Sequence, residues 1–579
     1  MKNILDLFFI INKRYPNSIY LFLFLFISTS ILETIGISLV IPIIALLLDA
    51  TFLETVQNSK YEAVFPDFIF ELNRAEAMIF FSVFIVVIYI LKSIFIYFSI
   101  YNISLFVGRV KAHLTYKLMF NYLHQNYLYY TKKNFSEINN NINQRVNDVC
   151  DGVVQAALYI ISEVTIMLGM FLLIIFFDQL NVFFIIFIFL LIGYGFAKLL
   201  NIKVSKYGVV RQKEVDVKFD IFARLISNIR EILLIGKFKF AFQNFYNALY
   251  KVATLDAKRQ ALQRSPGLVL ETVGVLSLVI IVFYLEYLNY STTKIIATCT
   301  FFAAIAYRSI PSLHKITFYN MSYRYYKPGF SKLWSEISLK EEVIYHNEKI
   351  DFNECIELKN INFNYNNKDN DNDKKVINNL NLKIPKNKKV GIYGKSGSGK
   401  TTLLDIISGL IKPSSGELLI DNNKIDNQYL LRKLQNNISY TSQRTTILND
   451  SFIGNICFGV EKELIDKKLC DYAIKFSKLE ELEKEFNKSN IFLNDTIKNL
   501  SGGQIQRIGI ARALYRDNDI LIFDEATNSL DEKTAYEILN NIMNINNKTI
   551  IIVSHNLDNL KDCDYVYEFK NGNLNLEKK

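Results

Sequence analysis

Long apolar stretches separated by charged segments fill the first 320 residues of the chain. They lie at about residues 19–48, 78–107, 153–177, 180–200, 265–290 and 294–320. Most reach the roughly 20 residues that a helix needs to cross the hydrocarbon core of a bilayer. Only the short polar sequence DQLN separates the third from the fourth, which indicates a tight helical hairpin. The pattern predicts six transmembrane helices within residues 1–330.

The charged segments between these stretches predict their orientation. The segments 108–152 and 198–264 are rich in lysine and arginine, whereas 49–77 is mostly acidic. Because basic loops stay in the cytoplasm, both basic segments and both chain ends are predicted to be cytoplasmic. The basic segments also keep a helical spacing of apolar residues, so we expect the membrane helices to continue beyond the bilayer.

A different pattern begins near residue 352. The sequences KKVGIYG, DILIFDE and KTIIIVSH are short apolar runs that end in turns, and helical segments lie between them. Such runs predict buried parallel strands. The chain is therefore predicted to combine an α-helical membrane domain over 1–330, a linker over 331–351 and an α/β domain over 352–579.

The composition agrees with a chain that lies partly in lipid and partly in water. Of 579 residues, 50% are hydrophobic and 21% are charged, which is apolar for a soluble protein. The net charge of +10 is dispersed, which favours membrane topology over nucleic-acid binding as its origin. The six cysteines form no CxxC pair, which argues against a disulfide framework or a zinc site.

The sequence GKSGSGKT lies between a predicted strand and a predicted helix. This spacing in this context is that of a phosphate-binding loop, in which glycines let backbone N–H groups approach a nucleotide. Lys400 would contact the β- and γ-phosphates of ATP, and Thr401 would ligate Mg²⁺. The residues expected to line the nucleotide here are Gly394, Lys395, Ser396, Gly397, Ser398, Gly399, Lys400, Thr401 and Thr402.

Two carboxylates end the apolar run ILIFDE. Asp524 is suited to the coordination shell of Mg²⁺, and Glu525 is placed to polarise an attacking water. An acidic pair at a strand end is weak evidence alone. It gains weight here because it follows a phosphate-binding loop in the same predicted domain.

The segment LSGGQ is a second glycine-rich phosphate grip, and it opens the helical run IQRIGIARAL. One chain does not need two such grips for one nucleotide. With the motifs above, this segment resembles the signature of the ABC ATPase family. The resemblance implies that Ser501, Gly502, Gly503 and Gln504 close on the γ-phosphate held by a partner domain, so that two domains enclose two ATP molecules.

Four further roles come from the resemblance. Gln443 matches the glutamine that senses Mg²⁺ and cargo, and Asp531 matches the aspartate that crosses the dimer interface. His555 matches the histidine that contacts the γ-phosphate, with an ordinary strand-end histidine as the alternative. Tyr365 matches the aromatic residue that stacks on adenine, with a core aromatic on an edge strand as the alternative.

The layout of predicted spans followed by one ATPase domain resembles ABC exporter half-transporters. With one ATPase domain per chain, it implies a dimer, most simply a homodimer, while a heterodimer stays open. The segments 127–137 and 219–235 are expected to supply coupling helices that dock on the ATPase domains. The implied location is the bacterial inner membrane, with the ATPase domain in the cytoplasm.

Two stretches in the predicted spans bear on the cargo. ETIGISLVIPIIALLLD and AYRSIPSLHKI resemble bacterial flippases that export lipid-linked oligosaccharides for N-glycosylation. The resemblance implies a polyprenyl-pyrophosphate-linked cargo, and export of peptides, drugs or other lipids is the alternative. A soluble ABC ATPase that acts on nucleic acid is disfavoured by the predicted spans. Full alternating access and a partial opening stay open.

Cations within the spans are expensive in hydrocarbon. From the helix rise, Arg308 and Lys92 lie ~21 Å below the outer surface of a ~30 Å core. Arg264 starts the fifth predicted span. One interpretation is a cationic patch for an anionic head group, since arginine binds phosphate well. The other is internal ion pairing, for which the candidate partners are Glu271, Glu163 and Glu33.

Overall fold

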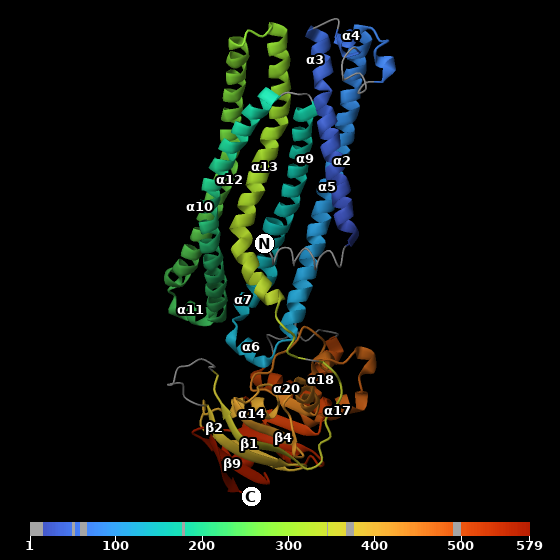
Figure 1. Ribbon diagram of the computed structural model, residues 1–579. Helices are drawn as coiled ribbons and strands as arrows, with labels where there is room; N and C mark the ends of the chain where they lie inside the picture. Colours follow the sequence, from blue (N-terminus) through green and yellow to red (C-terminus); the bar gives the residue numbers. More distant parts are fainter. Residues whose placement is uncertain are drawn as a thin grey trace. The chain divides into compact units, whose positions relative to one another are not determined.

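The computed structural model describes residues 16–48, 52–57, 66–176, 180–343, 345–365, 376–489 and 500–578 (Figure 1). The chain divides into two compact units. One comprises Met1–Leu123 and Lys133–Lys340, and is called the transmembrane unit below. The other comprises His124–Lys132 and Glu341–Lys579, and is called the ATPase unit below.

The transmembrane unit is helical in its described part (Figure 1). Its longer elements are α2 (Pro16–Ser38), α3 (Val40–Leu48), α5 (Arg74–Leu123), α9 (Gln155–Phe176), α10 (Leu180–Ser227), α12 (Phe238–Tyr287) and α13 (Thr292–Ile337). Short helices are α4 (Phe52–Gln57), η2 (Asp67–Ile69) and α11 (Ile229–Ile235). The helix α5 has 50 residues, or ~75 Å, more than twice the thickness of a bilayer core. The prediction that membrane helices continue beyond the bilayer is therefore confirmed.

The membrane-spanning segments can be compared with the long helices of the fold. Within the described residues, four helical segments are long and apolar enough to cross a membrane: Pro16–Leu47, Arg74–Leu123, Phe135–Phe176 and Phe238–Tyr287. The fourth and sixth predicted stretches lie in α10 and α13, which are helices of 48 and 46 residues. Six spans therefore remain a prediction, whereas six long helical segments at these places are observed.

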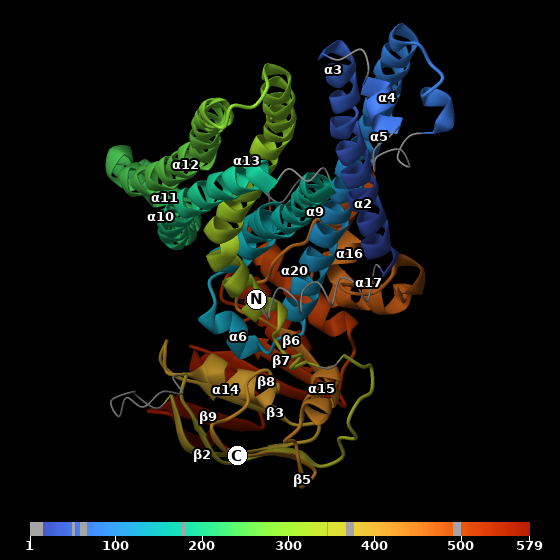
Figure 2. The ribbon, with the colours of Figure 1, turned by 45° about the horizontal axis from the view of Figure 1, so that its top comes forward.

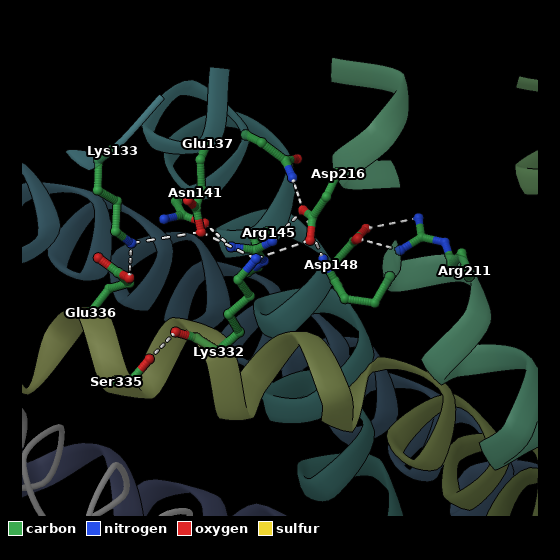
Figure 3. Close-up of polar contacts among 12 residues, drawn as sticks. Lys133, Glu137, Asn141, Arg145, Asp148, Arg211, Asp216, Lys332, Ser335 and Glu336 are labelled. Atoms are coloured by element: carbon green, nitrogen blue, oxygen red, sulfur yellow. Dashed lines mark hydrogen bonds and ion pairs between the residues drawn. The ribbon is translucent and has the colours of Figure 1, made fainter. Parts of the chain in front are cut away.

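A polar network joins several helices of the transmembrane unit (Figure 3). The chain from α7 (Phe135–Asn140) to α9 passes through α8 (Val146–Val149) and two wide π-helical turns, η3 (Asn141–Arg145) and η4 (Cys150–Val154). Arg145 is 1% exposed and lies 2.5 Å from Asp216 on α10, which also contacts Lys332 on α13 at 3.0 Å. Arg211 lies 2.5 Å from Asp148. These ion pairs tie the interrupted helix to its two neighbours.

The unit boundary differs from the predicted linker. Helix α13 ends at Ile337, so the range 331–351 begins as helix rather than as a connecting segment. Asn121 on α5 fixes this last turn by donating hydrogen bonds to the carbonyl oxygens of Glu336 and Ile337, at 3.1 and 2.7 Å. Satisfying carbonyl groups at its C-terminus stabilises the helix up to that point.

Part of the predicted coupling segment 127–137 groups with the ATPase unit. Helix α6 (Tyr127–Lys132) belongs to it, and Leu128 packs against its main hydrophobic core. The backbone N–H of Glu342 donates to the carbonyl oxygen of His124 at 2.9 Å, so the two chain segments of the unit are joined directly. The second predicted segment, 219–235, covers the end of α10 and α11 in the transmembrane unit.

Two sheets form the ATPase unit. An antiparallel sheet has the order β2-β1-β4-β5, and a mainly parallel sheet has the order β10-β9-β3-β8-β7-β6, most of which can be followed in Figure 2. The strands are β1 (Cys355–Phe363), β2 (Ile377–Pro385), β3 (Lys389–Tyr393), β4 (Ser415–Ile420), β5 (Asn423–Lys424), β6 (Ile438–Thr441), β7 (Ile520–Asp524), β8 (Thr549–Ser554), β9 (Tyr565–Lys570) and β10 (Asn573–Lys578).

The three predicted parallel strands are confirmed. They are β3, β7 and β8, which are neighbours in parallel register and mostly buried. The helices of the unit are α14 (Lys400–Ile407), α15 (Gln428–Asn436), α16 (Phe452–Ile456), α17 (Lys467–Phe476), α18 (Glu480–Ser489), α20 (Gly502–Tyr515) and α21 (Glu532–Met543), with single turns η5 (Lys462–Leu464) and η7 (Leu557–Leu560). The carboxyl ends of parallel strands meet at one edge, where ligands bind in folds of this type.

Candidate nucleotide site and charge cluster

The predicted phosphate loop connects β3 to α14, as its spacing requires. Gly397 and Gly399 have φ angles of 74° and 111°, in the left-handed region that glycine adopts without strain. Lys400 starts α14, and its Nζ donates to the carbonyl oxygens of Gly394 and Lys395 at 2.8 and 3.0 Å. Burial lowers the pKa of Lys400. The loop therefore wraps around one ammonium group at a helix N-terminus, an arrangement that favours phosphate.

Two of the three side chains predicted to hold Mg²⁺, those of Thr401 and Asp524, contact each other, and Tyr440, which was not predicted, joins them. Thr401 Oγ1 donates to Asp524 Oδ2 at 3.3 Å, and the Tyr440 hydroxyl donates to the same oxygen at 3.1 Å. Burial raises the pKa of Asp524. In the described part of the chain, no group of three His, Cys, Asp or Glu residues could hold a metal by itself. A hydroxyl and one carboxylate fit Mg²⁺, which is bound by few protein oxygens together with substrate phosphates.

The three predicted catalytic residues meet at the Glu525 carboxylate. Gln443 Nε2 donates to Glu525 Oε2 at 2.7 Å, and His555 Nε2 pairs with Oε1. Glu525 is buried and has a φ of 52°, a strained value for a residue with a side chain. The amide nitrogen of Gln443 thus bonds to Glu525, while the side-chain oxygen of Gln443 is of the type that ligates Mg²⁺.

Two residues that bond to Glu525, one at its carboxylate and one at its backbone carbonyl oxygen, were not predicted from the sequence. Asn528 Nδ2 donates to Glu525 Oε2 at 2.9 Å, and Gln506 Nε2 donates to the Glu525 carbonyl oxygen at 2.8 Å. Gln506 also accepts from the backbone N–H of Ser529 at 2.8 Å. Asn528 follows Glu525 by three residues in one turn, a spacing that could have indicated the contact. Gln506 lies on the signature helix, and no pattern in the sequence marks it.

The remaining nucleotide residues lie in two places. The Tyr365 hydroxyl is 2.9 Å from Thr402 Oγ1, and its ring packs edge-on against Phe363. Tyr365 thus lies beside the end of the phosphate loop and also against the core, so both interpretations of it stand. Ser501 caps α20 by accepting from the Gln504 backbone N–H at 3.2 Å.

The signature turn and the phosphate loop of the same chain are not joined by polar contacts within the described residues. Among the residues that the structure describes, no hydrogen bond or ion pair joins the turn 501–504 or Asp531 to the loop 394–402. Asp531 caps α21 instead, accepting from the backbone N–H of Thr534 at 2.9 Å. The turn is therefore available for a phosphate held elsewhere.

A second site of interest lies in the transmembrane unit, where five charged side chains from four helices meet. Glu33 on α2 is 2.9 Å from Lys92 on α5 and also pairs with Arg308 on α13. Glu163 on α9 accepts from Ser312 at 2.8 Å and from Lys315 at 2.7 Å. Its distance to Arg308 is 3.7 Å. We call Glu33, Lys92, Glu163, Arg308 and Lys315 the charge cluster.

The charge cluster unites two of the three predicted cargo cations. Arg264 is exposed on α12, and in the described residues it forms no ion pair with any member of the cluster. Glu271 is exposed as well and pairs with neither Lys92 nor Arg308 in this part of the chain. Lys315 was not predicted, although it follows Arg308 by seven residues, which places both on one helix face.

Comparisons with known families cover both units. Residues 377–528 match the family described as ABC transporter, and residues 19–308 match the ABC transporter transmembrane region. The second match alone spans half of the chain.

Individual relatives cover less of the chain. It is 33% identical to the ATP-dependent lipid A-core flippase of Desulfotalea psychrophila, over 38% of each chain. It is 29% identical to the heterocyst differentiation ATP-binding protein HepA of Nostoc sp., over 67% of this chain and 63% of that protein. The chain therefore spans less than two thirds of the length of either relative in these matches.

A solved structure supports the fold over nearly the whole length. The structure of a bacterial Atm1-family ABC exporter with ATP bound has a TM-score of 0.77 to this chain, at 16% identity. The match covers 98% of this chain and 95% of the exporter. The predicted exporter-type fold, a helical membrane domain with an α/β ATPase domain, is therefore confirmed. Together, the family matches and the arrangement of the phosphate loop, Glu525 and signature turn establish that the chain belongs to the ABC transporter family.

Proposed function

We propose that the protein is an ATP-driven exporter that works as a homodimer in the bacterial inner membrane, with its ATPase unit in the cytoplasm. The observation that carries the proposal is the grouping of Gln443, His555 and Asn528 on one buried carboxylate, that of Glu525. These contacts orient Glu525 toward the edge of the sheet that also carries the phosphate loop. A carboxylate so held is suited to position a water molecule for attack on a phosphate.

Each remaining part of the site has a role in ATP hydrolysis. Lys400 and the loop N–H groups would bind the β- and γ-phosphates. Thr401 and Asp524, with the Gln443 carbonyl oxygen, would hold Mg²⁺, which when bound neutralises charge on the phosphate oxygens. Tyr365 would stack on the adenine ring.

The dimer follows from the signature turn. Ser501 and the N–H groups of Gly502 and Gly503 open the 14-residue helix α20, where a phosphate is favoured. Because this turn is not bonded to its own phosphate loop, we propose that it completes the site of a second copy. Asp531 would lie at the same interface.

We further propose that the cargo is a lipid with a polyprenyl-pyrophosphate-linked oligosaccharide. The charge cluster supports an anionic head group, and one relative is described as a flippase of the lipid A core. Lys92 and Arg308 would contact the pyrophosphate, and Arg264 would contact the cargo only at another stage of transport. The alternative, export of peptides, drugs or other lipids, is supported by the same fold.

Reconstitution into proteoliposomes tests the proposal. Wild-type protein is expected to move a polyprenyl-pyrophosphate oligosaccharide across the membrane in an ATP-dependent manner, and Glu525→Gln is expected to abolish this movement. Glu532→Gln, at the exposed start of α21, is the matched control and should behave as wild type. ATP hydrolysis without movement of such lipids would retain the exporter and reject this cargo.

A further inference from the structure

The carboxylate of Glu33 is held differently from that of Glu163. Glu163 has a neutral hydrogen-bond donor, Ser312, as well as Lys315. In the described part of the chain, the only polar contacts of the Glu33 carboxylate are with the two cations Lys92 and Arg308. Glu33 is also the most buried member of the cluster, at 3% exposure, against 15% for Arg308. The Glu33 carboxylate is thus an internal anion that pairs with the guanidinium of Arg308.

The cluster has more cations than carboxylates. Lys92, Arg308 and Lys315 face two acidic groups, Glu33 and Glu163. Lys315 is half exposed, so its charge reaches the edge of the cluster. A site with surplus positive charge and low exposure favours an added anion, because opposite charges attract more strongly where water is scarce.

We infer that Glu33 is a built-in competitor, which holds Arg308 and which a phosphate group of the cargo must displace. This inference rests on the proposed cargo site. Lys92, at 2.9 Å, keeps the Glu33 carboxylate compensated during the exchange. Transfer of Arg308 from Glu33 to a phosphate therefore leaves no buried carboxylate without a cation, which would be strongly destabilising.

The competitor lowers the affinity for every anion. A carboxylate ligand offers Arg308 what Glu33 already offers, so it gains little from the exchange. A phosphate ester carries up to two negative charges and three acceptor oxygens, and it suits the fork of a guanidinium better. The guanidinium therefore sets the preference for phosphate, and Glu33 lowers the affinity for both kinds of anion by the same factor, so that only the tighter ligand binds at low concentration.

Binding measurements on the full-length protein in nanodiscs test the inference. The probes are dodecyl phosphate and dodecanoate, which share a chain and differ in the head group. In wild type, dodecyl phosphate is expected to bind more tightly than dodecanoate. In Glu33→Gln, the affinity for both probes is expected to rise. If Glu33 holds Arg308 for ~90% of the time in wild type, releasing Arg308 raises the affinity by about tenfold. The gain is expected to be similar for the two probes, because an internal competitor lowers the affinity of both by the same factor.

Two further variants make the result unambiguous. Glu286→Gln, an exposed acidic residue of α12, controls for the loss of one negative charge and should leave both affinities unchanged. Glu33→Asp keeps the charge but shortens the side chain, and it provides a smaller change in the same direction if Glu33→Gln does not assemble. Phosphate binding by wild type with unchanged affinities in the Glu33 variants would overturn the role of Glu33 alone. No phosphate binding by wild type would overturn the proposed cargo site as well.

Discussion

Two buried groups of charges in the transmembrane unit differ in how fully their cations are neutralised. Among the described residues of the network around Arg145, four cations pair with five carboxylates, all of which except Asp256 are labelled in Figure 3. These cations are Lys133, Arg145, Arg211 and Lys332, and the carboxylates are Glu137, Asp148, Asp216, Asp256 and Glu336. In the charge cluster the balance is reversed, because three cations share Glu33 and Glu163.

The comparison offers a physical criterion for function. A network whose cations are all neutralised by fixed carboxylates has little to gain from an added anion, so its role is to hold helices together. A cluster with surplus cations is incompletely satisfied, and its free energy falls when an anion binds. Buried ion pairs alone are weak evidence for either role. The ratio of cations to carboxylates distinguishes the structural role from the anion-binding role.

Replacing Arg145 should give the largest effect. Arg145→Ala removes a cation that is 1% exposed and leaves Asp216 and Asn141 without a shared partner. Breaking a buried pair in this way costs about 3 kcal/mol or more of folding free energy. The yield of folded protein and its thermal midpoint in detergent are therefore expected to fall sharply. The exposed Arg109→Ala provides the control and should be nearly silent.

Replacing Arg308 should impair binding of the cargo and leave folding of the protein nearly unchanged. Arg308→Ala leaves Glu33 paired with Lys92 and Glu163 paired with Lys315, so the folded yield should stay near that of wild type. Transport of a phosphate-linked lipid is expected to fall by about tenfold or more, as when one charge-assisted contact of about 1.5–3 kcal/mol is lost. A collapse of the folded yield to the level of Arg145→Ala would show that the cluster is structural.

The ATPase unit contains a third kind of buried charge, a carboxyl without a cation. Burial and, to a lesser extent, the nearby Asp524 carboxylate together raise the pKa of Asp405 to about 6. Because the folded state binds this proton more tightly than the unfolded chain does, ionisation above pH 6 weakens the fold. A shift of one pKa unit corresponds to roughly 1.4 kcal/mol of folding free energy, and partial exposure to solvent reduces this value. Asp405→Asn is therefore expected to stabilise the unit by about 1 kcal/mol at pH 7.5.

Hydrogen exchange of the α14 amides in the full-length protein measures this effect. Exchange through local opening should be slower in Asp405→Asn than in wild type at pH 7.5, and the difference should vanish near pH 4. Equal protection at both pH values would mean that Asp405 finds a partner in solution and is not a lone buried carboxyl.

The smallest expected effect is that of salt. At 1 M ionic strength charges are screened within ~3 Å, against ~8 Å at 0.15 M. Binding of dodecyl phosphate should weaken by about threefold over this range, because Lys315 is half exposed. The midpoint of thermal unfolding, which depends on the buried Arg145 network, should move little. A marked shift of the thermal midpoint together with an unchanged affinity for dodecyl phosphate would contradict this difference between the Arg145 network and the charge cluster.

Motifs with fixed spacing were read correctly because local geometry decides them. The loop before Lys400, the strands β3, β7 and β8, and the carboxylates Asp524 and Glu525 all lie where the sequence predicts. The partners of Arg308 could not be chosen in this way. Glu271, Glu163 and Glu33 were all candidates, and only the rotation of each helix about its axis places Glu33 and Glu163 inward and Glu271 outward.

Contacts between separate helices and strands could not be predicted from the sequence either. The end of α13 at Ile337 depends on Asn121, more than 200 residues away along the chain. Gln506 reaches the Glu525 carbonyl oxygen only because α20 packs beside β7. Apolar periodicity predicts that such helices exist, but it does not predict which polar side chain meets which.

The most direct test of the central claim is the rate of ATP-driven movement of two lipids that differ only in the head group. Proteoliposomes would contain either a polyprenyl pyrophosphate-linked oligosaccharide or the same chain and sugar joined through a neutral linkage, with Glu525→Gln as the inactive control. A cationic cluster that is incompletely neutralised predicts faster movement of the pyrophosphate lipid by tenfold or more. Equal rates for both lipids would contradict the account and assign Arg308 to an internal ion pair.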